Sequence, residues 1–196
     1  MANEPLQTRK LKHVEVCLNY PVEYSTRTTG FEAFDLPYRA LPETNLATIS
    51  TQTIFLGKPL TAPLLIGAMT GGAELSGIIN KNLAVAAETL GVGLMLGSQR
   101  VMLEHPEAVS SFAVRPYAPT TLLIGNLGVA QLNKGYNPQH LSRAVELVGA
   151  DALALHTNPL QEALQQKGDT NFSVLLPKLR QLVPMLGFPL ILKEVG

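Results

Sequence analysis

The segment Ala152-Leu153-Ala154-Leu155-His156-Thr157-Asn158-Pro159-Leu160-Gln161-Glu162 decides how the rest of the chain is interpreted. Its apolar first part predicts a short buried strand, and the Asn-Pro pair that follows breaks the extended backbone. A buried strand has no structural need to end in so many hydrogen-bonding groups. In α/β folds the carboxyl ends of the strands hold ligands. We therefore expect a binding site here, with Gln161 and Glu162 offering an amide to a substrate and a carboxylate to a hard metal ion.

Further apolar runs recur along the chain about every 30 residues, the length of one βα unit. Helical patterns separate them and predict a parallel sheet covered by helices. Each run opens into a polar or glycine-rich turn, so five strand ends contribute to one composite site. The expected strands are residues 64–67, 93–96, 121–124, 152–155 and 190–192, and the expected helices are 75–90, 106–114, 138–148 and 172–186.

The fold class expected from this rhythm is an α/β barrel of the (β/α)₈ TIM type. Such a barrel has eight strands and typically about 250 residues, whereas five strands are counted here. We therefore expect residues 61–196 to be a partial barrel, truncated after the fifth strand. Residues 1–60 are expected to be an N-terminal extension with a helix near 9–18 and a hairpin near 46–59. The alternative is a small open sheet.

Composition excludes several classes of function. The 196 residues carry zero net charge, no Trp and a single cysteine, Cys17. A nucleic-acid surface would need a basic stripe with stacking aromatic residues, which the chain lacks. No apolar run is long enough to span a bilayer, and the polar N-terminus is no secretory signal. One cysteine allows no internal disulfide, so we expect a reducing, cytoplasmic location without nucleic-acid or membrane partners.

Several strand-end residues suit a ligand, although each also has a purely structural interpretation. The turn at Met69-Thr70-Gly71-Gly72 can bring bare backbone close to a ring or phosphate, or can simply be tight. Arg100 is either an anion clamp or a surface residue. His156 alone is more typical of a satisfied core histidine. Lys193 ends an apolar strand, where an unpaired lysine is rarely buried, so it is expected to reach an anionic group unless Glu194 pairs with it.

Common catalytic motifs are absent, including the P-loop, HExxH, CxxC and GxSxG, and without GxGxxG a Rossmann fold loses its main support. The ordered set of motifs instead resembles type 2 isopentenyl-diphosphate isomerase, the flavin-dependent isomerase of isoprenoid synthesis, over the whole chain. The motifs are Arg9-Lys10-x-x-His13, Met69-Thr70-Gly71-Gly72, Gly97-Ser98-Gln99-Arg100, Asn126-Leu127-Gly128, His156-x-Asn158-x-x-Gln161-Glu162 and Lys193-Glu194-Val195-Gly196.

This resemblance implies a (β/α)₈ barrel that interconverts isopentenyl and dimethylallyl diphosphate by adding one proton and removing another. It also implies FMN in its reduced form, NADPH as the reductant, Mg²⁺, and assembly into homotetramers or homo-octamers. The motifs match FMN contacts at Ala68, Met69, Thr70, Ser98, Asn126 and Lys193. They match substrate contacts at Arg9, Lys10, Ser98, Gln99, Arg100 and Gln161, a diphosphate pocket at His156 and Asn158, and a Mg²⁺ ligand at Glu162.

Among these residues, Gln161, His156 and Lys193 are the candidates for catalysis. Gln161 either orients the reacting end of the substrate or relays a proton. Lys193 beside an anionic reduced flavin would favour that charge state. Two other functions stay open. One is an FMN-dependent 2-hydroxy-acid oxidoreductase on a related barrel, for which only His156 offers a base, and the other is an inactive truncated fragment.

Overall fold

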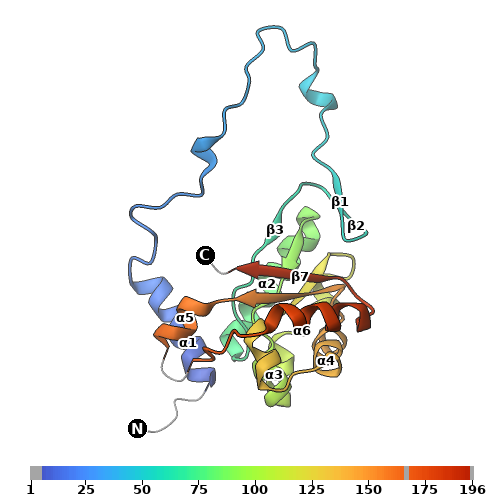
Figure 1. The fold of residues 1–196 in the computed structure, drawn as a ribbon. Coiled ribbons are helices and arrows are strands. Elements are labelled where there is room, and N and C mark those ends of the chain that lie inside the picture. The colour runs from blue at the N-terminus through green and yellow to red at the C-terminus, as the bar shows by residue number, and fades with distance from the viewer. Residues whose placement is uncertain (1–5, 166–167, 195–196) are drawn as a thin grey trace.

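The body of the protein is a sheet of five parallel strands in sequence order (Figure 1). The computed structural model describes residues 6–165 and 168–194, with side chains from residue 11 onward. Adjacent strands pair in parallel, and the longest pairing joins five residues of one strand to five of the next. The expected order and direction of the strands are confirmed. The strands are β3 (Leu65–Ile66), β4 (Gly93–Met95), β5 (Leu123–Gly128), β6 (Ala152–Thr157) and β7 (Leu190–Glu194).

The expected barrel is wrong for this structure. In the described residues the five strands form an open sheet with β3 and β7 at its edges, and no pairing joins those two edges. A (β/α)₈ barrel needs eight strands to close. The fold class is therefore corrected to an open parallel α/β sheet with a separate two-stranded antiparallel sheet. The expected division of the chain at residue 60 stays a prediction.

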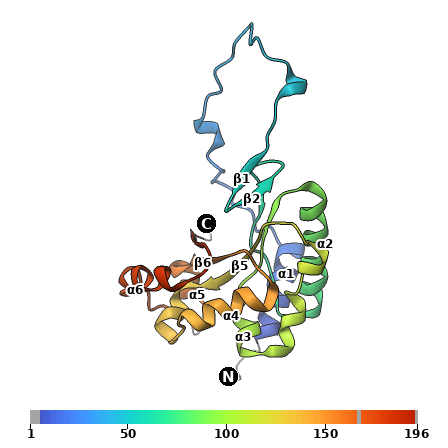
Figure 2. The same ribbon diagram turned by 90° about the vertical axis from the view of Figure 1, so that its right-hand side faces the viewer.

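Helices cover one face of the sheet and enclose the main apolar core (Figure 2). The expected helices near 75–90 and 138–148 are confirmed as α2 and α4. The third expected helix is mostly a 3₁₀ turn at Pro106–Ser111, and the fourth stops early because Pro184 has no backbone N–H to continue it. The helices are α2 (Glu74–Leu90), α3 (Arg100–Glu104), α4 (Pro138–Val148), α5 (Pro159–Leu164) and α6 (Leu175–Leu182).

The opposite face of the sheet has a smaller apolar cluster, built from alternate strand residues such as Ile124 and Ala154. An antiparallel hairpin of β1 (Thr53–Phe55) and β2 (Lys58–Leu60) contributes Leu60 to this cluster. The expected hairpin is present but shorter than 46–59, because residues 46–48 form a 3₁₀ turn. The helices therefore cover one face of the sheet, and the hairpin contributes to covering the other.

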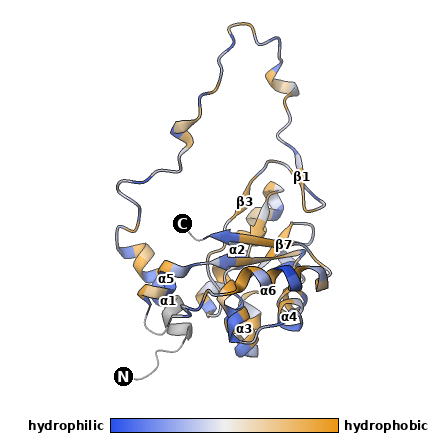
Figure 3. Cartoon of the chain, viewed as in Figure 1, coloured by the Kyte–Doolittle hydropathy of each residue, from blue (hydrophilic) through white to orange (hydrophobic). Residues whose placement is uncertain are grey.

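The N-terminal part consists of α1 (Leu6–Asn19) and an extended arm, residues 20–52, that loops away from the sheet (Figures 1 and 3). The arm has two short 3₁₀ turns and exposes large apolar side chains, including Phe31, Leu36 and Tyr38. None of the helices described is both long and apolar enough to cross a membrane.

Acidic side chains fasten the end of the sheet where β5 and β6 begin. Asp151 accepts hydrogen bonds from Arg115 and from the backbone of Leu123, and pairs with Lys58 of the hairpin. Glu88 of α2 accepts from the hydroxyl and the backbone N–H of both Thr120 and Thr121. These contacts tie a helix and the hairpin to the strands at the end of the sheet opposite the expected site.

We predict that Glu88 makes stability depend on pH. Desolvation acts to raise the pKa of Glu88, but the hydrogen bonds from Thr120 and Thr121 outweigh it and lower the pKa from 4.5 to about 2. A lowered folded-state pKa stabilises the fold above pH 4.5, and this contribution is lost as the pH falls toward 2. Urea unfolding should show Glu88→Gln less stable by about 1 kcal/mol at pH 7. An equal difference at low pH would contradict this origin.

Candidate functional site

Strand alternation brings three predicted residues to one face of the sheet. Side chains two residues apart point the same way, so Asn126 continues the row of Ile124, and His156 continues that of Ala154. In the parallel register, Gly128 pairs with His156 and His156 pairs with Lys193. The polar residues therefore extend the smaller apolar face of the sheet at the carboxyl ends of its strands, as the sequence predicts.

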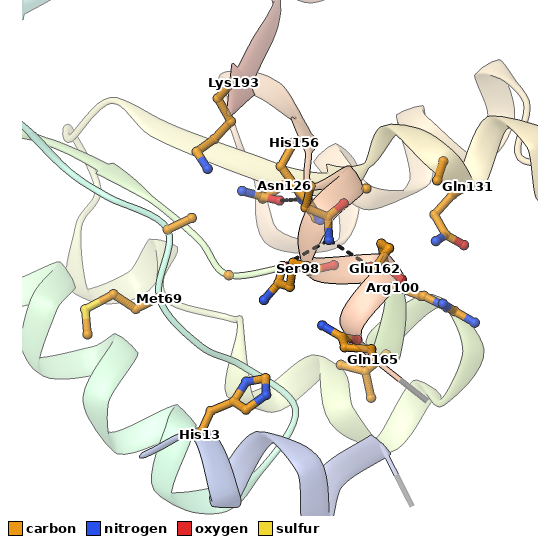
Figure 4. Close-up of a pocket in the computed structure, with 17 residues that line it drawn as sticks. His13, Met69, Ser98, Arg100, Asn126, Gln131, His156, Glu162, Gln165 and Lys193 are labelled. Atoms are coloured by element: carbon orange, nitrogen blue, oxygen red, sulfur yellow. Dashed lines mark hydrogen bonds between the residues drawn. The ribbon is translucent and has the colours of Figure 1, made fainter. Parts of the chain in front are cut away.

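A cavity of about 270 Å³ lies at these strand ends (Figure 4). Its wall is formed by the segments that follow β3, β4, β5 and β6, together with residues of the strands themselves, including β7, and of α1. Most of the predicted site residues contribute to it. The lining residues from that prediction are Ala68, Met69, Ser98, Arg100, Asn126, His156, Asn158, Gln161, Glu162 and Lys193.

Asn126 and His156 form a fixed pair in the cavity wall. His156 Nδ1 lies 2.7 Å from Asn126 Oδ1, and the Asn126 residue is only 1% exposed. Because the amide oxygen accepts, His156 Nδ1 is the donor of this hydrogen bond. Among the described residues, none accepts a hydrogen bond from Asn126 Nδ2. A buried amide donor in a cavity wall suits an acceptor on a bound ligand.

Asn158 arranges the two polar side chains at the start of α5. It is 4% exposed, and its Nδ2 donates to Gln161 Oε1 at 3.0 Å and to Glu162 Oε1 at 2.8 Å. The other carboxylate oxygen of Glu162 accepts from the backbone N–H of Asp169 at 2.6 Å. Asn158 is thus a support for its neighbours as well as a lining residue.

Arg100 reaches the cavity with its guanidinium already held by two carboxylates. Nε donates to Glu104 and Nη1 donates to Asp169, both at 2.8 Å. Asp169 also pairs with Lys134 and accepts from Gln131. Burial acts to raise the pKa of Asp169, but these hydrogen bonds and charges lower it overall. The cluster keeps Asp169 ionised and Arg100 fixed.

The structure does not bring Gln99 or Thr70 into the cavity. Gln99 is fully buried between the sheet and α4, where Oε1 accepts from the Asn126 backbone N–H and Nε2 donates to the Ala144 carbonyl, both at 2.8 Å. Gly125 permits this, because a Cβ there would lie 2.5 Å from Gln99 Oε1. The Thr70 hydroxyl bonds Ser76 instead. Both residues therefore stabilise the backbone around the cavity without lining it.

Several other residues extend or limit the sequence prediction. His13 points from α1 toward the cavity, and Gln131 and Gln165 also line it (Figure 4). His13 is not among the predicted site residues, because it lies in a helix and not at a strand end, although it belongs to the motif Arg9-Lys10-x-x-His13. The side chains of Arg9 and Lys10, predicted substrate contacts, lie outside the described residues, as do Val195 and Gly196 of the last motif.

The chemistry available in the cavity favours an anion and a hard metal ion. Lys193 pairs with no carboxylate among the described residues, and Arg100 adds a second cation to the wall. Within the same part of the chain, no group of three or more His, Cys, Asp or Glu side chains could hold a metal ion. Glu162 alone fits the mode in which Mg²⁺ is held by one carboxylate together with phosphate oxygens.

Comparison with known proteins gives one consistent name. No family model matches the chain. It is 57% identical over 192 residues to the isopentenyl-diphosphate delta-isomerase of Deinococcus radiodurans, which takes in 98% of this chain and 57% of that relative. Relatives with the same name from Mycolicibacterium gilvum and Oceanobacillus iheyensis are 58% and 46% identical, over 97% of this chain in each case and 56% and 55% of the relative. The chain thus spans just over half the length of these curated relatives.

We predict that Gln99→Leu destabilises the protein by about 3 kcal/mol, because it leaves a buried N–H and a buried carbonyl without partners. Urea unfolding measures the change. The matched control is Gln161→Leu in the exposed cavity wall, which should lower stability by less than about 1 kcal/mol. Equal effects of the two substitutions would mean that Gln99 does not support the strands.

Proposed function

We propose that this protein is an isopentenyl-diphosphate delta-isomerase, and that it is of the flavin-dependent type 2. The observation that carries the proposal is the cavity at the carboxyl ends of the sheet, where amide, imidazole, carboxylate and cationic side chains from successive strands line one space. The names of the relatives, at up to 58% identity, support the isomerase activity. The ordered motifs support the flavin-dependent type.

The residues around Asn126 fit FMN. Its buried Nδ2 offers a donor to an acceptor on the edge of a flat ring, and His156 fixes the orientation of that amide. Ala68 and Met69 form the wall beside the end of β4, and Ser98 offers a hydroxyl. We infer that these residues hold FMN together with Lys193, whose ammonium would favour an anionic ring. Thr70, the remaining predicted FMN contact, belongs to the same turn as Met69, and its hydroxyl is bonded to Ser76.

The reaction adds a proton at one carbon of the substrate and removes one from another. FMN held by these residues and reduced by NADPH would supply a group able to give the substrate a proton and to take one back without net oxidation. The protein's own role is to orient the substrate and to neutralise its diphosphate. Gln161, held by Asn158, is positioned to orient the reacting end or to relay a proton. His156 presents a ring to the same space whose orientation is fixed by Asn126.

The diphosphate is proposed to lie near Arg100 and Glu162. Arg100 contributes a charge-assisted donor, and Glu162 would hold Mg²⁺ with the phosphate oxygens. Arg9 and Lys10 are proposed to add positive charge from α1. The neutral substrate tail then extends toward Gln161. We further propose a cytoplasmic location, consistent with the single cysteine, and a homotetramer or homo-octamer.

The direct test uses the full-length protein with FMN and NADPH. We expect a yellow protein that converts isopentenyl diphosphate to dimethylallyl diphosphate only after reduction and only with Mg²⁺, followed by product chromatography. Conversion with neither flavin nor reductant would support an isomerase but contradict type 2. A colourless protein without conversion under any of these conditions would contradict the proposal.

We predict that Glu162→Gln raises the Mg²⁺ concentration needed for half-maximal activity by at least about tenfold. FMN binding should change little. The melting temperature should fall by no more than a few degrees, because the amide oxygen can keep only one of the two hydrogen bonds that the carboxylate accepts from Asn158 and Asp169. The matched control is Glu146→Gln, the same chemical change on the exposed side of α4. If the Mg²⁺ curves of Glu162→Gln and wild type coincide, Glu162 only begins the helix, where a carboxylate favours the dipole.

A further inference from the structure

Asp169 joins three parts of the cavity wall. It follows α5 and is 7% exposed, although it is a carboxylate. Oδ2 accepts from Arg100 Nη1 at 2.8 Å and from Gln131 Nε2 at 2.9 Å, and Oδ1 pairs with Lys134 Nζ at 2.9 Å. A buried carboxylate persists only when it is paired in this way. One side chain therefore links the segments that follow β4, β5 and β6.

The contact with Asp169 fixes which part of Arg100 can meet a ligand. Glu104 takes Nε and Asp169 takes Nη1, whereas Nη2 donates to no residue in the described part of the chain. The guanidinium is planar and rigid, so anchoring Nε and Nη1 orients Nη2. A donor oriented before the ligand arrives avoids the cost of ordering it during binding.

The backbone of Asp169 acts on a second site residue. Its N–H donates to Glu162 Oε2 at 2.6 Å, while Asn158 holds Oε1. The carboxylate plane of Glu162 is thus set from both sides. The same loop residue orients the cationic donor and the acidic group of the cavity.

We propose that Asp169 is a positioning residue for the diphosphate-binding half of the cavity, acting through Arg100 and Glu162 without contacting the ligand. This inference rests on the function proposed above. It assigns the loop after α5 a role in ligand binding that the strand-end residues alone do not show. Asp169 does not line the cavity itself, which is why the role is one of positioning.

Asp151 offers a matched control at the other end of the sheet. Like Asp169, it pairs with one arginine and one lysine, through Arg115 and Lys58. It contacts no residue of the cavity wall among its hydrogen bonds and ion pairs in the described chain. Asp151→Asn therefore removes a similar set of ionic contacts without disturbing the ligand-binding groups.

The experiment measures the binding of inorganic pyrophosphate to the full-length protein by calorimetry, with and without Mg²⁺, together with melting temperatures and steady-state kinetics. We expect Asp169→Asn to weaken pyrophosphate binding by about tenfold to a hundredfold. KM for isopentenyl diphosphate should rise by a similar factor, with kcat changed less. Asp151→Asn should bind as wild type does. The double variant Asp169→Asn with Arg100→Lys should bind little worse than Arg100→Lys alone in the absence of Mg²⁺.

Unchanged pyrophosphate binding by Asp169→Asn, in a protein whose wild type binds and isomerises, would overturn the inference alone. If the double variant weakens pyrophosphate binding by the product of the two single effects, Asp169 does not act through Arg100, and the inference is overturned. If Asp169→Asn fails to fold while Asp151→Asn folds, Asp169 is a residue of the folding core and the inference is also overturned. If wild type neither binds pyrophosphate nor isomerises, the proposed function fails first and this inference fails with it.

Discussion

The parallel pairing of β5 with β6 and of β6 with β7 is the constraint on which the cavity depends. Each strand delivers a side chain to the cavity only at its carboxyl end, and the register decides which one. His156 is paired on both sides, with Gly128 on one strand and Lys193 on the other. A slip of one residue would turn these side chains to the opposite face. The apolar residues earlier in each strand fix the register, because only one register buries them on both faces.

Buried polar side chains then hold the segments that form the cavity wall in place. Gln99 joins the strand ends to α4, Asn158 holds the start of α5, and Asp169 fixes the loop beyond it. Each of these groups would be costly to leave without partners in a low-dielectric interior, so each is confined to one arrangement. The wall is accordingly held by hydrogen bonds whose loss affects either stability or ligand binding, according to which residue is changed.

The sequence predicts the strands well because short apolar runs and the turns after them are local signals. It also predicts α4, whose first turn Asn137 caps by accepting from the His140 backbone N–H. It does not predict sheet closure, which depends on long-range pairing. Gln99 and Thr70, both predicted as ligand contacts, do not line the cavity, because sequence does not show which way a polar side chain after a strand points. Asp169 has no local signal, since its partners are brought together by three separate strands.

The two ends of the sheet hold different carboxylates for different purposes. Asp151 and Glu88 fasten the amino ends of the strands, and Glu162 and Asp169 lie beyond the carboxyl ends. Substitutions can therefore accumulate at one end with little effect on the other, because distant sites without shared partners behave additively. For protein engineering, this separates the choice of positions: thermostability is to be sought around Arg115 and the hairpin, and altered ligand preference around the loops after β4, β5 and β6.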